Sequence, residues 1–104
     1  MPSPALTVKI LLPFRIFAEH ADVRSMVAEA KGGLFGIMPH RLDCVAALVP
    51  GILTLTTASA GEFHVAVDAG VLVKSGFDVL VSVRQAMLGK DLGSLRAAVE
   101  QDYL

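Results

Sequence analysis

The chain has 104 residues, nine of them basic and ten acidic, with a formal net charge of -1 at pH 7. This length predicts one domain, and the near balance of charge gives no electrostatic basis for binding nucleic acid or an anionic membrane surface. Hydrophobic residues make up 54% of the chain and charged residues 18%. Because small domains have a large surface for their volume, we expect a chain this apolar either to be covered by a partner or to enter lipid.

Most of the chain alternates apolar and polar residues with the period of two that is typical of β-strands. A polar break is expected at 20–22, and glycine-rich or proline-containing turns separate the other strands. The predicted strands are 6–12, 14–19, 23–28, 34–37, 43–49, 52–57, 62–67, 71–74 and 77–84. Short strands at regular spacing predict a mainly β fold, an antiparallel β-sandwich or barrel of about eight to ten short strands.

The stretch from Cys44 to Gly61 contains 18 residues without a charge, which is the minimum length for a membrane-spanning helix. Pro50-Gly51 lies in its middle, and in a helix interior proline costs about 3 kcal/mol and glycine about 1 kcal/mol. Two strands joined by a turn are therefore favoured over a membrane span. The N-terminus has no basic segment before its apolar run, so we expect no signal peptide. The single cysteine, Cys44, fits a reducing compartment.

The last segment changes to helical spacing. Asp91 is a candidate N-cap, and the apolar residues after it recur at steps of three and four on one stripe of a short helix. The stripe consists of Leu92, Leu95, Val99 and Tyr103. A helix of this length is only marginally stable alone, so we expect it to pack on the β-domain. The expected organisation is a sandwich domain over 1–88 and a short C-terminal helix over 89–104.

The sequence indicates no catalytic residues, no cofactor and no metal site. The histidines lie in separate segments without the spacing of metal ligands, at His20, His40 and His64. We expect Asp43 to bond backbone amides at its corner and Cys44 to be a buried, inert thiol. The cluster of glycines at 32–36 lacks the following helix and lysine of a phosphate-binding loop. An interaction protein is therefore the default expectation.

Three segments resemble, in order, those of the epsilon subunits of F-type ATP synthases. Residues 33–55 contain G-x-F-G-I-x-P, a polar corner and then P-G-I-L-T-L. Residues 69–83 are similar to a glycine-led hairpin of that family, and G-K-D-L-G-S-L-R-A-A at 89–98 is similar to the start of its C-terminal helices. P-x-x-x-D at 39–43 and A-A-L-V-P-G-I-L at 46–53 are similar to the epsilon-like subunits of the alternate, ion-translocating branch.

The resemblance implies a β-sandwich at the foot of the rotor of a proton- or sodium-translocating ATP synthase, without catalytic activity of its own. Its implied partners are the gamma subunit and the ring of membrane-embedded c subunits, with the catalytic head subunits as a further contact. It would be peripheral to the membrane, on the cytoplasmic side of the bacterial inner membrane. The implied ring-facing residues are Phe35, Ile37, Met38, Pro39, His40, Arg41 and Asp43.

Two features depart from the family. Arg41 stands where the family has histidine, and Asp43 stands where it usually has proline. Near the C-terminus, Gly93 replaces the aspartate of a D-x-x-R-A motif through which some members bind ATP, and no second helix follows, so the segment resembles the remnant of a helical hairpin. We therefore expect neither micromolar ATP binding nor inhibition by an extended arm. The alternative is a small β-barrel ligand-binding protein or an adaptor unrelated to ATPases.

Overall fold

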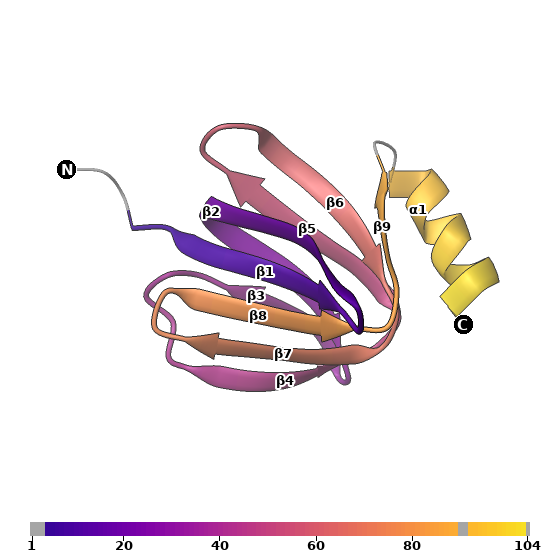
Figure 1. Cartoon of the computed structure of the whole chain (residues 1–104), viewed down its shortest axis with the longest axis horizontal. Helices are drawn as coiled ribbons and strands as arrows, with labels where there is room; N and C mark the ends of the chain where they lie inside the picture. Colours follow the sequence, from indigo (N-terminus) through magenta and orange to yellow (C-terminus); the bar gives the residue numbers. More distant parts are fainter. Residues whose placement is uncertain (1–3, 90–91, 104) are drawn as a thin grey trace.

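The computed structural model describes residues 4–89 and 92–103 (Figure 1). Within them the chain forms nine strands and a short C-terminal helix. The elements are β1 (Leu6–Leu12), β2 (Arg15–Ala30), β3 (Gly33–Ile37), β4 (Cys44–Leu48), β5 (Gly51–Thr57), β6 (Gly61–Val67), β7 (Gly70–Ser75), β8 (Asp78–Val83), β9 (Ala86–Gly89), α1 (Leu92–Ala98) and the π-helical turn η1 (Val99–Tyr103). The mainly β expectation is confirmed. The predicted strands agree with the observed ones within one residue at each end, except at 14–19 and 23–28.

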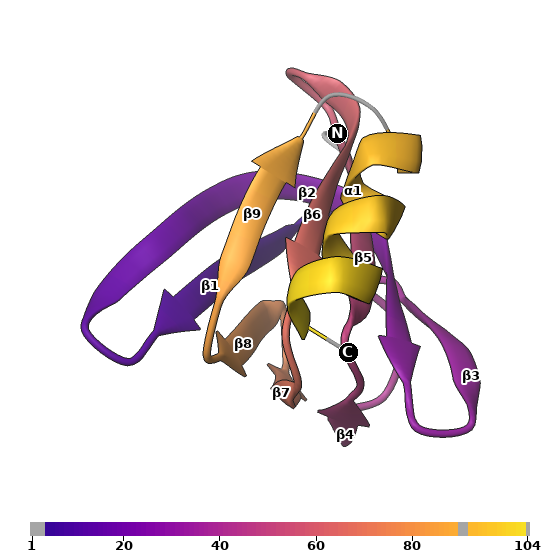
Figure 2. The same cartoon turned by 90° about the vertical axis from the view of Figure 1, so that its right-hand side faces the viewer.

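The strands form a sandwich whose two layers share the long strand β2. One layer runs β1-β8-β7-β4, and the other contains β3, β5, β6 and β9 around the second half of β2 (Figures 1 and 2). The first half of β2 pairs with β1, which links the layers along one side. The pairings are antiparallel except that β1 lies parallel to β8, which corrects the purely antiparallel expectation.

The polar break expected at 20–22 is wrong, because β2 continues through it. Asp22 is used instead to hold the turn between β5 and β6: its carboxylate accepts hydrogen bonds from the backbone N–H and the hydroxyl of Ser59. Its carbonyl accepts a third from the N–H of Ala58 at 3.1 Å. The register with β5 shifts between Val23 and Ser25, where the strand passes from one layer to the other. A local polar cluster thus marks a bulge rather than a strand end.

The core lies between the two layers and is built from the inward positions of the alternating strands. On β8 the alternating side chains of Val79, Val81 and Val83 are buried, whereas Phe77, which directly precedes the strand, is 53% exposed. The largest fully buried side chains are those of Leu6, Ile10, Met26, Ile37, Leu53, Leu55 and Leu72. Burying one such aliphatic side chain contributes about 1.5–3 kcal/mol, so this core is the main source of stability.

The C-terminal helix packs on the outer side of β5 and β6, as Figure 2 shows. Leu95 and Val99 form a second apolar cluster with Ile52 and Ala66, separate from the sandwich core. The expectation that the helix packs on the β-domain is confirmed. The N-cap proposed at Asp91 lies outside the described residues, as do the side chains of Leu92 and Tyr103.

The segment between β8 and α1 forms one further strand. β9 was not predicted, because the four residues A-M-L-G show no apolar alternation; it forms by pairing with the free edge of β6. The expected boundary at residue 88 falls inside this strand. The uncharged stretch from Cys44 to Gly61 forms β4, a turn and β5, as predicted. Among the described residues, no helix is long and apolar enough to cross a membrane.

Candidate functional site: the loop between β3 and β4 and the outer face of β4, β7 and β8

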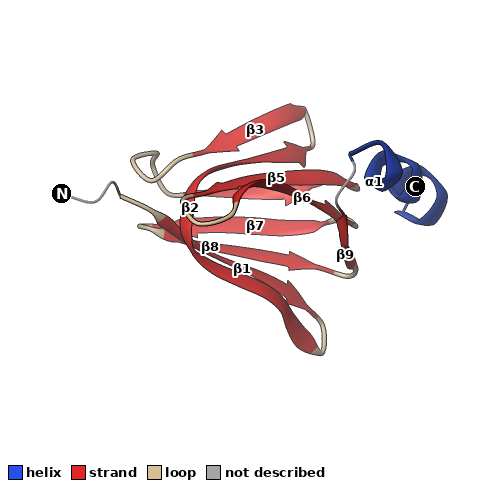
Figure 3. Ribbon diagram, turned by 90° about the horizontal axis from the view of Figure 1, so that it is seen from above, coloured by secondary structure: helices blue, strands red, loops and turns tan. Residues whose placement is uncertain are grey.

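The loop that joins β3 to β4 lies at the opposite end of the sandwich from helix α1 (Figure 3). Its turn is closed by a hydrogen bond of 3.0 Å from the N–H of Arg41 to the carbonyl oxygen of Met38. Leu42 is 86% exposed and Met38 59% exposed, so the loop presents two apolar side chains to solvent. Leu42 was not among the predicted ring-facing residues, although it lies between two of them.

The seven predicted residues do not all reach this surface. The side chain of Ile37 is fully buried in the core, where it anchors the end of β3. Ile37 therefore does not present the exposed side chain that the expectation requires. Phe35 is half-buried, and the guanidinium of Arg41 lies over its ring at 4.6 Å from the centroid. Such a cation–π contact holds the arginine side chain against the strand. His40 is exposed and Pro39 half-buried.

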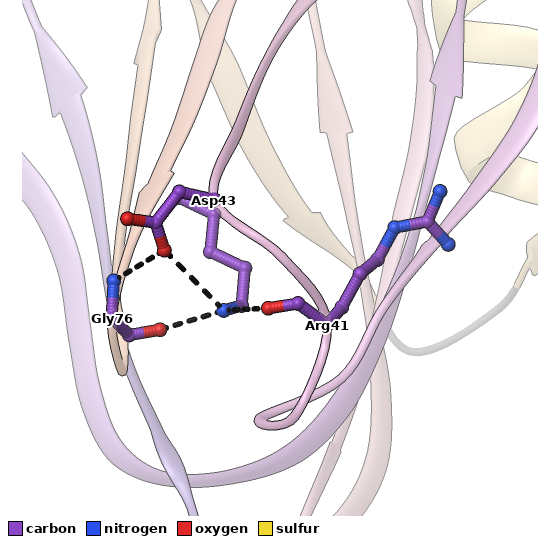
Figure 4. Close-up of polar contacts among 4 residues, drawn as sticks. Arg41, Asp43 and Gly76 are labelled. Atoms are coloured by element: carbon purple, nitrogen blue, oxygen red, sulfur yellow. Dashed lines mark hydrogen bonds and ion pairs between the residues drawn. The ribbon is translucent and has the colours of Figure 1, made fainter.

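Asp43 bonds a backbone amide, as the sequence predicts, but this amide lies in a turn far along the chain and not at the corner itself. Its Oδ1 accepts a hydrogen bond of 2.7 Å from the N–H of Gly76, in the turn between β7 and β8 (Figure 4). Lys74 lies between the two turns: its Nζ donates to the carbonyl oxygens of Arg41 at 2.6 Å and Gly76 at 2.7 Å. The same Nζ is 4.0 Å from Asp43 Oδ1. One buried ammonium therefore connects both turns.

Sequence reasoning missed the role of Lys74. Lys74 is only 2% exposed, and a lysine is almost never fully buried unless it is paired. The alternation of β7 carried the signal, because residue 74 shares the inward face with the buried Leu72. A lysine at an inward position needs acceptors, and the sequence does not show which backbone carbonyls would lie within reach.

Other candidate polar residues do not assemble into a reactive site. His64 Nδ1 is 2.9 Å from Thr54 Oγ1, and the ring of His20 lies 4.9 Å from that of Phe63. Both histidines line a mainly apolar cleft of about 710 Å³ between the start of β2 and strands β6 and β9. No group of three potential metal ligands occurs among the described residues. Cys44 is a free thiol that is half-buried rather than fully buried as expected.

A contiguous apolar surface covers the outer face of the layer that contains β1, β8, β7 and β4. We call this surface the outer apolar face. It is formed by Val45 and Ala47 of β4, Val71 and Val73 of β7, and Leu80 of β8. In the strand register Val45 lies opposite Val73, and Val73 lies opposite Leu80, so three exposed aliphatic side chains form one row across three strands. On β1 and β2 the row continues into the ion pair of Lys9 and Glu19, whose charged atoms are 3.8 Å apart.

Sequence comparison identifies the family. A model of the ATP synthase delta/epsilon chain β-sandwich domain matches residues 5–89. The chain is 32% identical over 99 residues to the ATP synthase epsilon chain 2 of Paraburkholderia xenovorans (strain LB400), an alignment that covers 94% of this chain and 71% of that protein. It is 29% identical over 98 residues to the ATP synthase epsilon chain 2 of Cereibacter sphaeroides, covering 93% of this chain and 67% of that one.

Two solved structures share the fold. A chain of the Euglena gracilis mitochondrial ATP synthase, determined by cryo-EM with OSCP, F1 and the c-ring, superposes with a TM-score of 0.76 at 16% identity. The match covers 95% of the present chain but only 64% of the length of the Euglena chain. A chain of the central stalk and c-ring of the Tetrahymena thermophila mitochondrial ATP synthase superposes with a TM-score of 0.67 at 13% identity, covering 92% of this chain and 88% of that one. With sequence and fold in agreement, the chain belongs to the family of epsilon subunits of F-type ATP synthases.

Proposed function

We propose that this chain is a non-catalytic central-stalk subunit that couples the gamma subunit to the c-ring of a proton- or sodium-translocating F-type ATP synthase. Family membership excludes the alternative of a protein unrelated to ATPases. The division into a sandwich and a C-terminal helix, with its boundary near residue 88, is part of the proposal. So is a peripheral location on the cytoplasmic side of the bacterial inner membrane, reached through the complex.

The observation that carries the proposal is the outer apolar face. A contiguous exposed apolar patch on a small protein marks an interaction surface, because leaving it in water is unfavourable. Val45 is 72% exposed, and Val71, Val73 and Leu80 are 45%, 37% and 40% exposed. These side chains stand on a rigid three-stranded sheet, which can receive a partner without reordering. We assign this face to the gamma subunit.

The loop between β3 and β4 supplies the second contact, to the c-ring. Met38 and Leu42 are exposed at the end of the sandwich, whereas the outer apolar face covers one side of it. Two surfaces that point in different directions on one rigid body allow the chain to bind two partners at once. That is the arrangement required of a subunit that transmits torque.

Co-purification with the cognate gamma subunit, followed by size exclusion, tests the proposal. We expect a stable one-to-one complex, and we expect Val73→Glu to abolish it by placing a charge in the centre of the apolar row. Leu34→Glu is the matched control, because Leu34 is 74% exposed on β3, outside this face. A wild-type chain that elutes as a monomer and ignores gamma would contradict the proposed function.

A further inference from the structure

We propose that Lys74 is a positioning residue, which locks the loop between β3 and β4 to the turn between β7 and β8 and so creates one preformed docking surface. This surface, which we call the two-turn surface, includes Phe77 and Leu42 in addition to the exposed loop residues predicted from the sequence. The identity of its partner, the c-ring, rests on the proposed function. The lock itself does not, and it can be tested on the chain alone.

The contacts of the ammonium group define the lock. Lysine has three N–H donors and no acceptor. Two donors are directed at carbonyl oxygens that lie 35 residues apart in sequence, those of Arg41 at 2.6 Å and Gly76 at 2.7 Å. Asp43 is the nearest anion, at 4.0 Å. Because the ammonium is buried, water does not compete for these bonds, and each turn is held through its backbone rather than through a movable side chain.

Gly76 is engaged from both sides. Its carbonyl accepts from Lys74, and its N–H donates to Asp43 at 2.7 Å (Figure 4). Its φ of +62° lies in the left-handed region, where glycine is unstrained and other residues are disfavoured. The turn can therefore present both backbone groups of one residue to the loop. Lys74 and Asp43 together use both of them.

The lock places two exposed apolar side chains on neighbouring turns. Phe77 directly follows Gly76 and is 53% exposed, and Leu42 directly precedes Asp43 and is 86% exposed. A loop that is already ordered loses less conformational entropy on binding, so fixing its backbone raises its affinity for a partner. Lys74 makes no contact with a partner itself, since it is buried. Its effect is expected to pass only through the shape of the two turns.

The substitution Lys74→Met tests the lock, because methionine has a similar length and is apolar but offers no donor. We expect amide hydrogen exchange of Arg41 and Gly76 to become at least about tenfold faster, while amides of the β5–β6 hairpin keep their wild-type rates. Lys9→Met is the matched control, since the half-buried Lys9 forms its ion pair with Glu19 in the middle of β1, away from both turns. Unchanged exchange at both turns in Lys74→Met would overturn the lock.

Binding separates positioning from general stability. With purified c-ring and gamma subunit, we expect Lys74→Met to weaken ring binding about tenfold and to leave gamma binding unchanged, because the outer apolar face lies on the other side of β7. Equal losses for both partners, or an unchanged ring affinity despite faster exchange, would overturn the positioning role. A wild-type chain that fails to bind the ring would overturn the proposed function and the docking half of this inference, but not the lock.

A second pair of variants examines the two-turn surface without touching the lock. Phe77→Ala should weaken ring binding by about tenfold, as expected for an aromatic anchor near the centre of a contact. Phe14→Ala is the control, because Phe14 is 98% exposed in the turn after β1, at the opposite end of the layer from Phe77. If both variants bind the ring as the wild type does, Phe77 does not belong to the docking surface.

Discussion

Arg96 of helix α1 donates a hydrogen bond of 2.8 Å to Glu29 of β2, a residue 67 positions earlier in the chain. The other carboxylate oxygen of Glu29 accepts the backbone N–H of Ile52 on β5. One half-buried carboxylate therefore joins the C-terminal helix to two strands of the layer beneath it. The apolar contact through Leu95 and this polar contact through Arg96 hold successive residues of the same helix.

The two partners of this pair should differ in their effect on stability. Arg96→Ala removes only an exposed ion pair and is expected to cost about 0.2–1 kcal/mol. Glu29→Ala also leaves the N–H of Ile52 without its acceptor and is expected to cost about 1–3 kcal/mol. Urea unfolding of both variants measures the difference. Equal losses would mean that the bond to Ile52 adds nothing to stability.

Helix docking should depend mainly on Leu95, which is 2% exposed in the small cluster with Ile52, Ala66 and Val99. We expect Leu95→Ala to weaken docking by about 2–5 kcal/mol, the usual cost of truncating a buried leucine. An isolated helix this short is unstable in water, so the helical circular dichroism signal should fall while the β signal is kept. Retention of the full helical signal would contradict this.

The stability of the β5–β6 turn should depend on pH through Asp22. The hydrogen bonds from the hydroxyl and N–H of Ser59 lower the pKa of this carboxyl below its ordinary value of 3.8. A carboxyl with a lowered folded-state pKa stabilises the fold above its unfolded pKa, and this contribution is lost as the pH falls through the folded value. The melting temperature of wild type should therefore exceed that of Asp22→Asn by a constant amount at neutral pH, and the difference should shrink below about pH 4.

Ser59→Ala provides the complementary measurement, because it removes one of the donors and keeps the carboxyl. Its melting temperature should approach that of wild type over the same acidic range. A difference that is constant from neutral to strongly acidic pH would show that the charge of Asp22 is not involved.

Gly70 is required by a close approach of two strands. A Cβ atom at this position would meet the backbone carbonyl oxygen of Ser82 and the side chain of Val83 on β8. Gly70→Ala should therefore lower the free energy of unfolding by about 1–3 kcal/mol, the usual cost of overpacking. Gly36→Ala is the control: a Cβ there meets nothing within 4 Å, and the change should be neutral. Two variants of equal stability in urea would contradict the steric reason.

ATP is expected not to bind with micromolar affinity. Gly93 stands at the position of the motif aspartate, and the guanidinium of Arg96 is already paired with Glu29. Isothermal titration calorimetry with Mg-ATP should show no saturable heat. A saturable signal in the micromolar range, lost in Arg96→Ala, would reverse this expectation.

The amino-acid sequence by itself determined the sandwich and most of its strands. The alternation of apolar and polar residues, with a period of two, indicates which face of a strand is buried. It does so for each residue, whichever strand is the partner. The inward valines of β8 and the uncharged pair β4–β5 could be predicted for this reason. The loop could be located as well, because its glycines and Pro39 are local signals of a turn.

Tertiary structure alone decided the rest, because it depends on contacts between residues far apart in the chain. β2 continues through its polar segment because Asp22 accepts hydrogen bonds from Ser59. β9 forms because the edge of β6 is free to pair with it. Lys74 is tolerated inside because the carbonyls of Arg41 and Gly76 converge on it. The energy of a buried charge depends on where its partners are, and no local pattern records that position.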